Sequence, residues 1–401
     1  MTVYDNITPS TVSPFGKGMK AIFVRSVVQI VRRPVYWVGF IVIPMFLIIF
    51  FGSILSPGLP TRLPAAIVDL DGSTLSRGIT QDLNGMQMID LTHSCNSFSE
   101  ARHLMQKGDI YGYFLIPHNF QSDLLAGRKP EITYYTNMTY FVPGSLLFKT
   151  FKTTAVYSKA GIAARVVQDA GIDPSAAVSV MQPINIVTRG IGNPTMNYAI
   201  YLANSFTPCM LQLMIMLMTA FSIGQEIKYK TSTRLLAMAD GSIVKALFAK
   251  LLPQTVIWLV IVTFMTSWLY KYQHLPMNGS WFWLALSELL FVLASQAFAV
   301  FVTCAVPNLR LSLSLCALTG ILSFSIAAFS FPEQSMYGAM SIFSWLMPVR
   351  YNFLIYADQV LNGIPVYYSR VWYAAYLVYL ILPFTLLWNL KRIMLKPVYI
   401  P

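Results

Sequence analysis

Glu288 is the one ionisable residue that falls within the long apolar runs of this sequence, where a carboxylate is costly. Glu288 lies within the apolar run 281–306, and Gln296 follows it further along the same run. An ionisable residue at membrane depth is a candidate for carrying a proton or an ion, and a plain hydrogen bond between helices explains it equally well. The second acid, Glu226, lies in a short basic segment at 224–250. These residues are the first candidates for function.

The other residue types that could do chemistry show no arrangement that indicates a site. His93, His103 and His118 are not at metal-ligand spacings, and no Gly-x-Ser-x-Gly pattern occurs. Asp69 and Asp71 flank the end of a predicted strand, where capping of a turn explains them better than catalysis. The cysteines have no paired spacing. We therefore expect neither a catalytic site nor a metal site in this chain.

The composition is that of an integral membrane protein. Hydrophobic residues make up 56% of the chain and charged residues only 11%, whereas a soluble domain carries about 25% charged residues. The net charge is +12, but the basic residues concentrate beside apolar runs. That distribution is typical of contact with a lipid bilayer and argues against nucleic-acid binding.

Six apolar runs are long enough to cross a membrane, so the sequence predicts a polytopic α-helical membrane protein with six transmembrane helices. The bias of Lys and Arg toward the cytoplasmic side places both termini in the cytoplasm. The runs are 36–55, within a first transmembrane segment at 34–56, and then 198–223, 251–270, 281–306, 311–331 and 371–390.

Residues 1–33 form a cytoplasmic tail followed by an amphipathic helix over 14–33. An apolar stripe recurs at helical spacing, with basic residues on the other side, which suits a helix in the membrane interface. An ordinary basic leader that orients the first span explains the same residues. The stripe includes Met19, Phe23 and Val27, and the basic residues include Arg25, Arg32 and Arg33.

Residues 57–197 have the composition of a soluble domain inserted between the first two spans. Short apolar strands alternate with capped helices, which favours a small α/β domain outside the cytoplasm. A long helical stretch from 141 onward resembles a stalk that returns the chain to the membrane. The predicted strands are 65–69, 86–91, 111–116 and 131–135.

Residues 332–370 are too apolar for a free loop and too interrupted for a span. Pro332, Pro348, Gly363 and Pro365 break the segment into short helices. A re-entrant pair of helices fits best, because irregular backbone at membrane depth must be buried in protein. The polar residues of this segment include Glu333, Arg350 and Asp358.

The segment 224–250 connects spans two and three and has two explanations. Five cationic residues against two acids indicate the cytoplasmic side. A solvated linker whose charges only fix the topology explains this composition. A docking surface for a cytoplasmic partner explains it as well, because the segment is partly helical.

Three stretches together resemble the permease subunits of type-2 ABC (ATP-binding cassette) exporters, in the branch with a large extracytoplasmic domain between the first and second spans. The first stretch comprises residues 68–73 and 112–120 of the insert. The second is the coupling loop 224–250, with Glu226, Thr233 and Leu236 in corresponding places, although Ser232 and Ala249 stand where glycine is usual. The third is 347–351 with Asn362-Gly363, including Pro348, Arg350, Tyr351 and Gly363.

The resemblance implies a transport subunit of the bacterial inner membrane that hydrolyses nothing. The chain has no Gly-x-x-x-x-Gly-Lys-Ser/Thr motif, so ATP and Mg would be bound by a separate cytoplasmic ABC ATPase. A second permease copy or a related permease would complete the dimer, and a periplasmic membrane-fusion adaptor is a further implied partner. The cargo would be drugs, lipids or other amphiphiles. The implied coupling residues are Glu226, Lys228, Lys230, Thr233, Arg234, Leu235 and Leu236.

Two other classes of protein stay open from the residues alone. A proton-coupled secondary transporter would use Glu288 as its carrier, although six spans without an evident repeat argue against it. A surface receptor or adhesion protein would use the inserted domain to bind its ligand and would need no ATPase.

Overall fold

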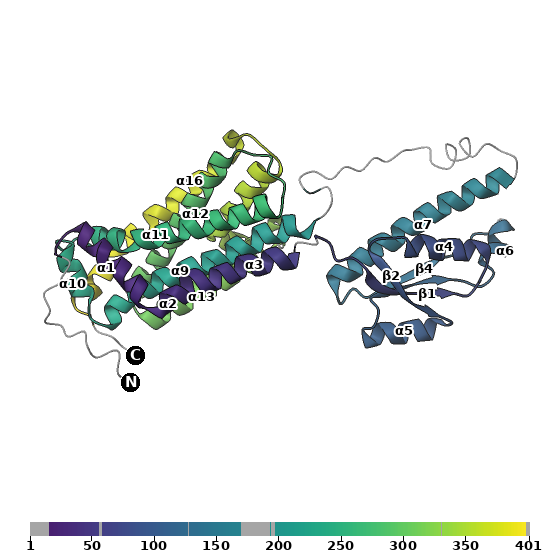
Figure 1. Cartoon of the computed structure of the whole chain (residues 1–401), viewed down its shortest axis with the longest axis horizontal. Coiled ribbons are helices and arrows are strands. Elements are labelled where there is room, and N and C mark those ends of the chain that lie inside the picture. The colour runs from purple at the N-terminus through teal and green to yellow at the C-terminus, as the bar shows by residue number, and fades with distance from the viewer. Residues whose placement is uncertain are drawn as a thin grey trace. The chain divides into compact units, whose positions relative to one another are not determined.

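The computed structural model describes residues 16–55, 58–126, 128–169, 193, 197–329 and 331–397. The chain divides into two compact units, one formed by residues 1–58 and 190–401 and the other by residues 59–189. We call them the membrane unit and the inserted unit, and each is described by itself (Figure 1).

The membrane unit contains the long apolar helices. Within the described residues six helical stretches are long and apolar enough to cross a membrane, in agreement with the six predicted spans. They are Pro34–Leu55, Ala199–Lys228, Ile243–Tyr272, Trp281–Ala305, Leu309–Ile326 and Val366–Leu395.

Several of these spans are irregular. The first begins as α2 (Pro34–Trp37), opens into a π-helical turn (Val38–Val42) and continues as α3 (Ile43–Leu55). Pro44 explains the wide turn, because its ring clashes with the carbonyl four residues earlier. The last span was predicted as one continuous helix over 371–390. It consists instead of α16 (Val366–Ile381), a 3-10 turn (Leu382–Thr385) around Pro383, and α17 (Leu387–Leu395).

Helix α9 (Asn204–Lys228), preceded by a π-helical turn (Ala199–Ala203), is the most buried of these spans. It packs against α12 (Trp281–Ala305) and α13 (Leu309–Ile326). Gly320 of α13 lies so close to Leu213 that an added Cβ would be 2.5 Å from that side chain. Small residues on α13 therefore allow the two helices to approach closely.

The segment predicted as re-entrant consists of short pieces. They are a 3-10 turn (Glu333–Ser335), α14 (Gly338–Trp345), α15 (Pro348–Ile355) and a π-helical turn (Tyr356–Leu361). Pro348 is the first residue of α15, where the missing N–H costs nothing. Most of α15 is buried against other helices, whereas α14 is largely exposed. That this whole segment dips into the bilayer as a re-entrant pair of helices stays a prediction.

The inserted unit contains a four-stranded sheet in the order β2-β1-β3-β4. β1 (Leu63–Asp69) pairs in parallel with β2 (Ile89–Cys95) and β3 (Gly112–Ile116), and β4 (Thr133–Thr136) pairs antiparallel with β3. Its helices are α4 (Thr74–Asn84), α5 (Phe98–Lys107), α6 (Phe120–Leu125) and α7 (Phe141–Asp169).

One strand of this sheet lies later than predicted. The expectation placed a strand at 86–91, but β2 runs over Ile89–Cys95. Its second half is the polar sequence Thr92-His93-Ser94, which an edge strand tolerates because one side faces solvent. Asp69, at the end of β1, accepts hydrogen bonds from the backbone of Asp71 and Gly72, so its visible role is to fix the turn.

Candidate functional site

The candidate site lies where α9 gives way to the short helix α10 (Ser232–Met238), which is followed by α11 (Ile243–Ser267). Helix α9 extends through Lys228, and α11 already begins at Ile243, so both helices reach into the segment predicted as a loop. Lys230 adopts a positive φ of 53°, which lets the chain reverse between α9 and α10.

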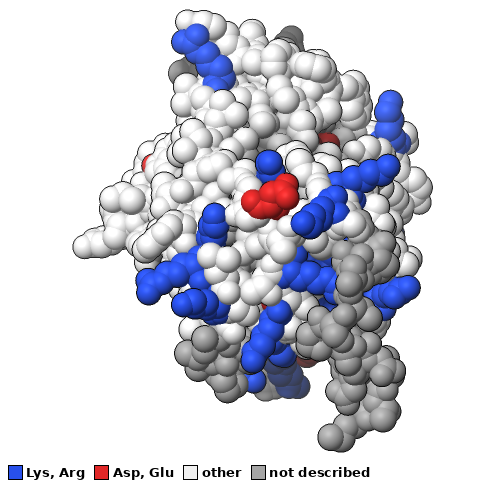
Figure 2. Space-filling view, turned by 90° about the vertical axis from the view of Figure 1, so that its left-hand side faces the viewer, with Lys and Arg blue, Asp and Glu red and all other residues white. Residues whose placement is uncertain are grey.

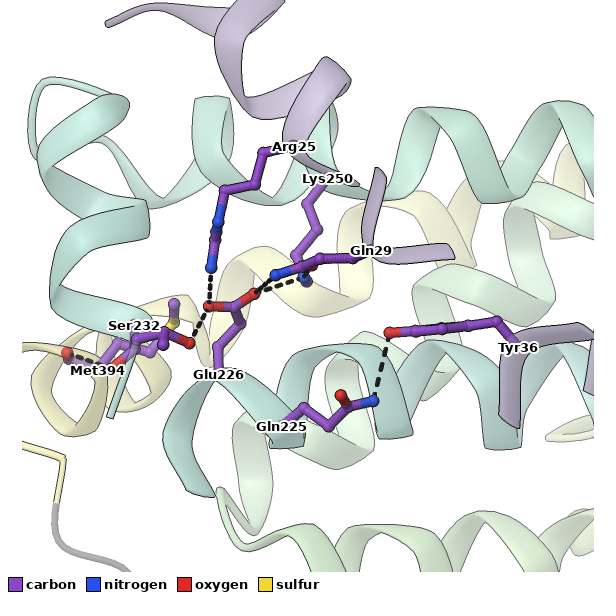
Figure 3. Close-up of polar contacts among 9 residues, drawn as sticks. Arg25, Gln29, Tyr36, Gln225, Glu226, Ser232, Lys250 and Met394 are labelled. Atoms are coloured by element: carbon purple, nitrogen blue, oxygen red, sulfur yellow. Dashed lines mark hydrogen bonds and ion pairs between the residues drawn. The ribbon is translucent and has the colours of Figure 1, made fainter. Parts of the chain in front are cut away.

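Glu226 is the centre of a buried polar cluster at this end of α9. Its carboxylate lies 2.7 Å from the Arg25 guanidinium of α1 (Met19–Arg32) and 2.8 Å from the Lys250 ammonium of α11 (Figure 3). Gln29 also donates to it from α1, and the Thr231 hydroxyl donates from the turn before α10. One carboxylate therefore joins α1, α9 and α11 (Figure 3).

The arrangement follows from helix spacing. Arg25 and Gln29 are four residues apart on α1, so their side chains share one face. The Gln29 amide nitrogen donates to Glu226 at 3.3 Å, and its oxygen accepts a hydrogen bond from Lys250 at 3.2 Å. Gln29 thus bridges the anion and one of the two cations.

The cluster is almost fully removed from solvent. Glu226 is 2% exposed, Lys250 1% and Arg25 8%. A buried charge is tolerated only when it is paired and hydrogen-bonded. Here one carboxylate pairs with two cations, so its single negative charge leaves the cluster with one excess positive charge.

Helix α10 is fastened to the same end of the membrane unit. The Ser232 hydroxyl donates to the carbonyl of Met394 in α17 at 2.8 Å (Figure 3), and the amide of Gly18 donates to the carbonyl of Met238 at 2.9 Å. Leu235 and Leu236 are buried in a hydrophobic core shared with α1 and α17. A force applied to α10 would therefore reach both terminal segments of the membrane unit.

The outward side of α10 and its flanking turn is polar. Lys228, Lys230 and Thr233 are exposed, and Arg234 is half-buried. Figure 2 views this end of the membrane unit and shows many Lys and Arg side chains around few acidic ones. The surface has the charge expected for contact with an acidic partner.

The predicted interfacial helix is turned differently from the expectation. Arg25 was assigned to the solvent side with Arg32 and Arg33, but it is buried against Glu226. The reason is the ion pair, which draws the guanidinium toward the protein. The predicted apolar stripe does not lie on one common face: Met19 is exposed, whereas Phe23 and Val27 line a cavity against α11.

The polar residues of the re-entrant segment fall into two groups. The Arg350 guanidinium pairs with Glu333, and it stacks 3.8 Å from the centre of the Trp345 ring. Tyr351 donates to the Trp345 carbonyl at 2.8 Å. Trp345 is the common contact of this group.

Asp358 belongs to the second group and accepts hydrogen bonds from Ser369 and Trp372 of α16. Gly363 has a positive φ of 61°, which allows the tight turn before α16.

The two intramembrane polar residues make separate contacts. Glu288 accepts a hydrogen bond from Thr266, and no basic side chain pairs with it within the described ranges. Gln296 accepts a hydrogen bond from Thr255 at 2.7 Å. Their eight-residue separation on α12 corresponds to about 12 Å along the helix, so the two side chains do not form one site.

Lys250, Gln29 and Thr231 were not among the predicted site residues. Lys250 carried a usable signal, because it directly precedes the apolar run of α11, where an ammonium group needs a buried acid as partner. Glu226 at the end of the preceding span was the available acid. Gln29 could have been found from its spacing of four from Arg25.

Residues 34–390 match the model of a family described as ABC-2 family transporter protein. The chain belongs to the ABC-2 transporter family. Glu226 and Lys250 lie within the matched residues of this ABC-2 permease, whereas Arg25 precedes them. Membership makes the chain a multi-pass transport subunit rather than a catalytic enzyme. No curated protein matches the chain in sequence.

Proposed function

We propose that this ABC-2 permease is the membrane subunit of an ATP-driven exporter, and that a separate ABC ATPase docks on the end that carries α1 and α10. The observation that carries the proposal is the Glu226 cluster. It ties α1, α9 and α11 together by buried ion pairs, and Thr231, which directly precedes α10, donates a hydrogen bond to the same carboxylate. A partner that pushes on α10 would thereby move three helices together.

The charge distribution supports a cytoplasmic location for this end. Lys228, Lys230, Arg234 and Lys245 lie between the end of α9 and the first turn of α11, and cytoplasmic loops carry an excess of such residues. Since α3 separates α1 from the inserted unit by one crossing, the inserted unit would lie outside the cytoplasm. Both termini would then be cytoplasmic and the protein would reside in a bacterial inner membrane.

The mechanism that we propose is mechanical. The ATPase would bind ATP and Mg, and closure of the ATPase would displace α10. Separating a buried carboxylate from its cations is costly, so α1, α9 and α11 would shift as one body. Because α9 packs closely on α13, that shift would open or close a passage along the seam with a second permease copy. The cargo would be an amphiphile, and a periplasmic adaptor would meet the inserted unit.

The docking surface can be tested by photo-crosslinking. A benzoylphenylalanine in place of Thr233, which is exposed on α10, should crosslink to an ABC ATPase in native membranes, identified by mass spectrometry. Tyr272 is exposed at the opposite end of its span and serves as the matched control position, where no ATPase should be captured. An ATPase captured at Tyr272 and not at Thr233 would overturn the proposal.

A further inference from the structure

A small polar cavity of about 20 Å³ lies around Glu288, between α9, α11, α12 and α15. The other three helices all pack against α12, and α9, α11 and α12 belong to membrane-spanning stretches. A cavity needs about 10–15 Å³ to hold one water molecule, so this one has room for a single occupant of that size. The polar residues of its lining include Asn204, Thr266, Tyr270, Glu288, Asn352 and Tyr356.

Two oxygen atoms in this lining accept no hydrogen bond from the described residues. Thr266 donates to Oε1 of Glu288, which leaves Oε2 of the same carboxylate without a donor. The side-chain oxygen of Asn352 also accepts none. Glu288 is 8% exposed and Asn352 9%, and neither oxygen is sealed off from a water-sized molecule. Because both residues line the cavity, both oxygens are available to its occupant.

The hydroxyl groups of the lining can offer only lone pairs, since each has a single hydrogen. Tyr270 donates its hydrogen to the Asn204 side chain at 2.8 Å, and Tyr356 donates to the Ile200 carbonyl at 2.6 Å. The Thr266 hydrogen is likewise used by acceptors within the protein. The cavity therefore presents mainly oxygen acceptors and a carboxylate, which is the ligand set of a hard cation.

The backbone beside the cavity is irregular in a way that suits an ion site. Pro208 also lines the cavity and has no N–H, so the Asn204 carbonyl lacks its usual helical donor. Unwound carbonyls of this kind coordinate Na⁺ in membrane transporters. Three π-helical turns also meet here, and such turns are often found at functional sites. Asn204 follows the turn Ala199–Ala203, Tyr270 lies in the turn Trp268–Tyr272, and Tyr356 begins the turn Tyr356–Leu361.

The charge of the lining favours a monovalent cation. Among the described residues of the lining, Glu288 is the only carboxylate, and no Lys, Arg or His accompanies it. An ionised carboxylate among membrane-spanning helices is costly unless a positive charge compensates it. One positive charge neutralises Glu288, whereas a divalent ion would leave an excess charge buried.

We propose that this cavity binds one monovalent cation of the size of sodium, with Glu288 Oε2 as its counter-charge and the Asn352 oxygen as a further ligand. The ion joins α12 to α15 and stays in place, so it is distinct from the amphiphile that we propose as cargo. The site does not depend on the proposed coupling to an ATPase, because its lining contains neither the Glu226 cluster nor α10. It can therefore be tested on the permease alone.

Binding of radioactive sodium to the full purified chain tests the proposal, in a buffer whose other cation is choline. We expect saturable binding of one ion per chain. The thermal unfolding midpoint should rise with sodium chloride but not with choline chloride at the same ionic strength, because a ligand that binds only the folded state stabilises it. No saturable binding of sodium would overturn the proposal and would indicate a water molecule beside a protonated Glu288.

Matched variants assign the ion to the cavity. Glu288→Gln keeps the size of the side chain and an acceptor for Thr266 but removes the charge, so it should abolish sodium binding and the sodium-dependent shift. Glu333→Gln removes a carboxylate of the same unit outside the lining and should keep both. Asn352→Leu should weaken sodium binding about tenfold, the effect of one contact with a charged group.

Two results would contradict the site. Sodium binding by Glu288→Gln at the wild-type affinity would show that the ion is bound elsewhere. Equal affinities of the wild type and Asn352→Leu would show that the Asn352 oxygen is not a ligand. The second variant keeps the question decidable if Glu288→Gln fails to fold.

Discussion

Lys250 of α11 donates a hydrogen bond of 2.8 Å to the carboxylate of Glu226 on α9, and both side chains are almost completely buried. The two residues lie on opposite sides of α10 in the chain, so the ion pair closes the whole α9–α10–α11 connection. Arg25 adds α1 to the same carboxylate. In the ABC-2 permease, one buried carboxylate thereby joins α1, α9 and α11 at the end that we propose to be cytoplasmic.

Replacing Glu226 with Gln should destabilise the membrane unit strongly. The substitution leaves two buried cations without an anion, a change that costs about 3–5 kcal/mol. Thermal unfolding in detergent should show a large decrease of the midpoint. Lys230→Gln, at an exposed position in the neighbouring turn, is the matched control and should unfold as the wild type does. Equal midpoints for Glu226→Gln and the control would refute the structural role of the cluster.

Replacing Lys250 with Met should cost less than replacing Glu226. Arg25 still pairs with the carboxylate in that variant, so no charge is left without a partner. In the double variant Glu226→Gln, Lys250→Met, part of the damage should be recovered, with a coupling of about 0.5–3 kcal/mol. Strictly additive changes in unfolding free energy would show that the two residues do not interact.

The pairing of Glu333 should depend on pH. Burial raises the pKa of its carboxyl, but hydrogen bonds from Trp345 and Ser341 and the charge of Arg350 outweigh burial and lower the pKa below the ordinary 4.5. Since the folded-state pKa is depressed, the stabilisation is complete above the ordinary value and is lost as the pH falls below it.

The measurement compares the wild type with Glu333→Gln. The wild type should be the more stable protein near neutral pH, and the difference in unfolding midpoint should shrink as the pH falls below the ordinary pKa of 4.5. If the difference in unfolding midpoint between the wild type and Glu333→Gln grew on acidification, the proposed pairing of Glu333 with Arg350 would be contradicted.

Replacing Glu288 with Gln should leave transport largely intact. Within the described part of the chain its carboxylate accepts a hydrogen bond from Thr266 and pairs with no basic side chain, and an amide oxygen can accept the same hydrogen bond. The assay is uptake of a fluorescent amphiphile into inverted membrane vesicles. Abolished uptake in Glu288→Gln, with the protein still folded, would favour the proton-coupled alternative.

Periodicity and charge were enough to predict the six spans and the short helices after Pro332, because apolar length and proline act locally along the chain. The sequence also led to Glu226 as a candidate. What it did not reveal is that Arg25 is buried, since its helix is amphipathic and places basic residues on one side. The position of Arg25 is decided by an acid 201 residues away, and no local pattern contains that information.

The strand β2 and the last span show the same limit. Polar residues at 92–94 conceal an edge strand, and Pro383 divides a run that hydropathy alone joins. For the coupling residues, the resemblance named Thr233 and Lys230, which are exposed in the structure, but it did not name Lys250. A lysine next to an apolar run can turn toward the lipid headgroups as well as toward a buried acid, so the position of Lys250 beside such a run suggested an acidic partner but did not decide between the two.

The central claim is that α10 faces the cytoplasm, and labelling with a membrane-impermeant maleimide tests it most directly. The natural cysteines Cys95, Cys209, Cys304 and Cys316 are all buried, so a new thiol at exposed Thr233 gives a clear signal. We expect Thr233→Cys to be unlabelled in intact spheroplasts and labelled after permeabilisation. Tyr272→Cys, at the opposite end of its span, should already be labelled in intact spheroplasts. Labelling of Thr233→Cys in intact spheroplasts would contradict the account.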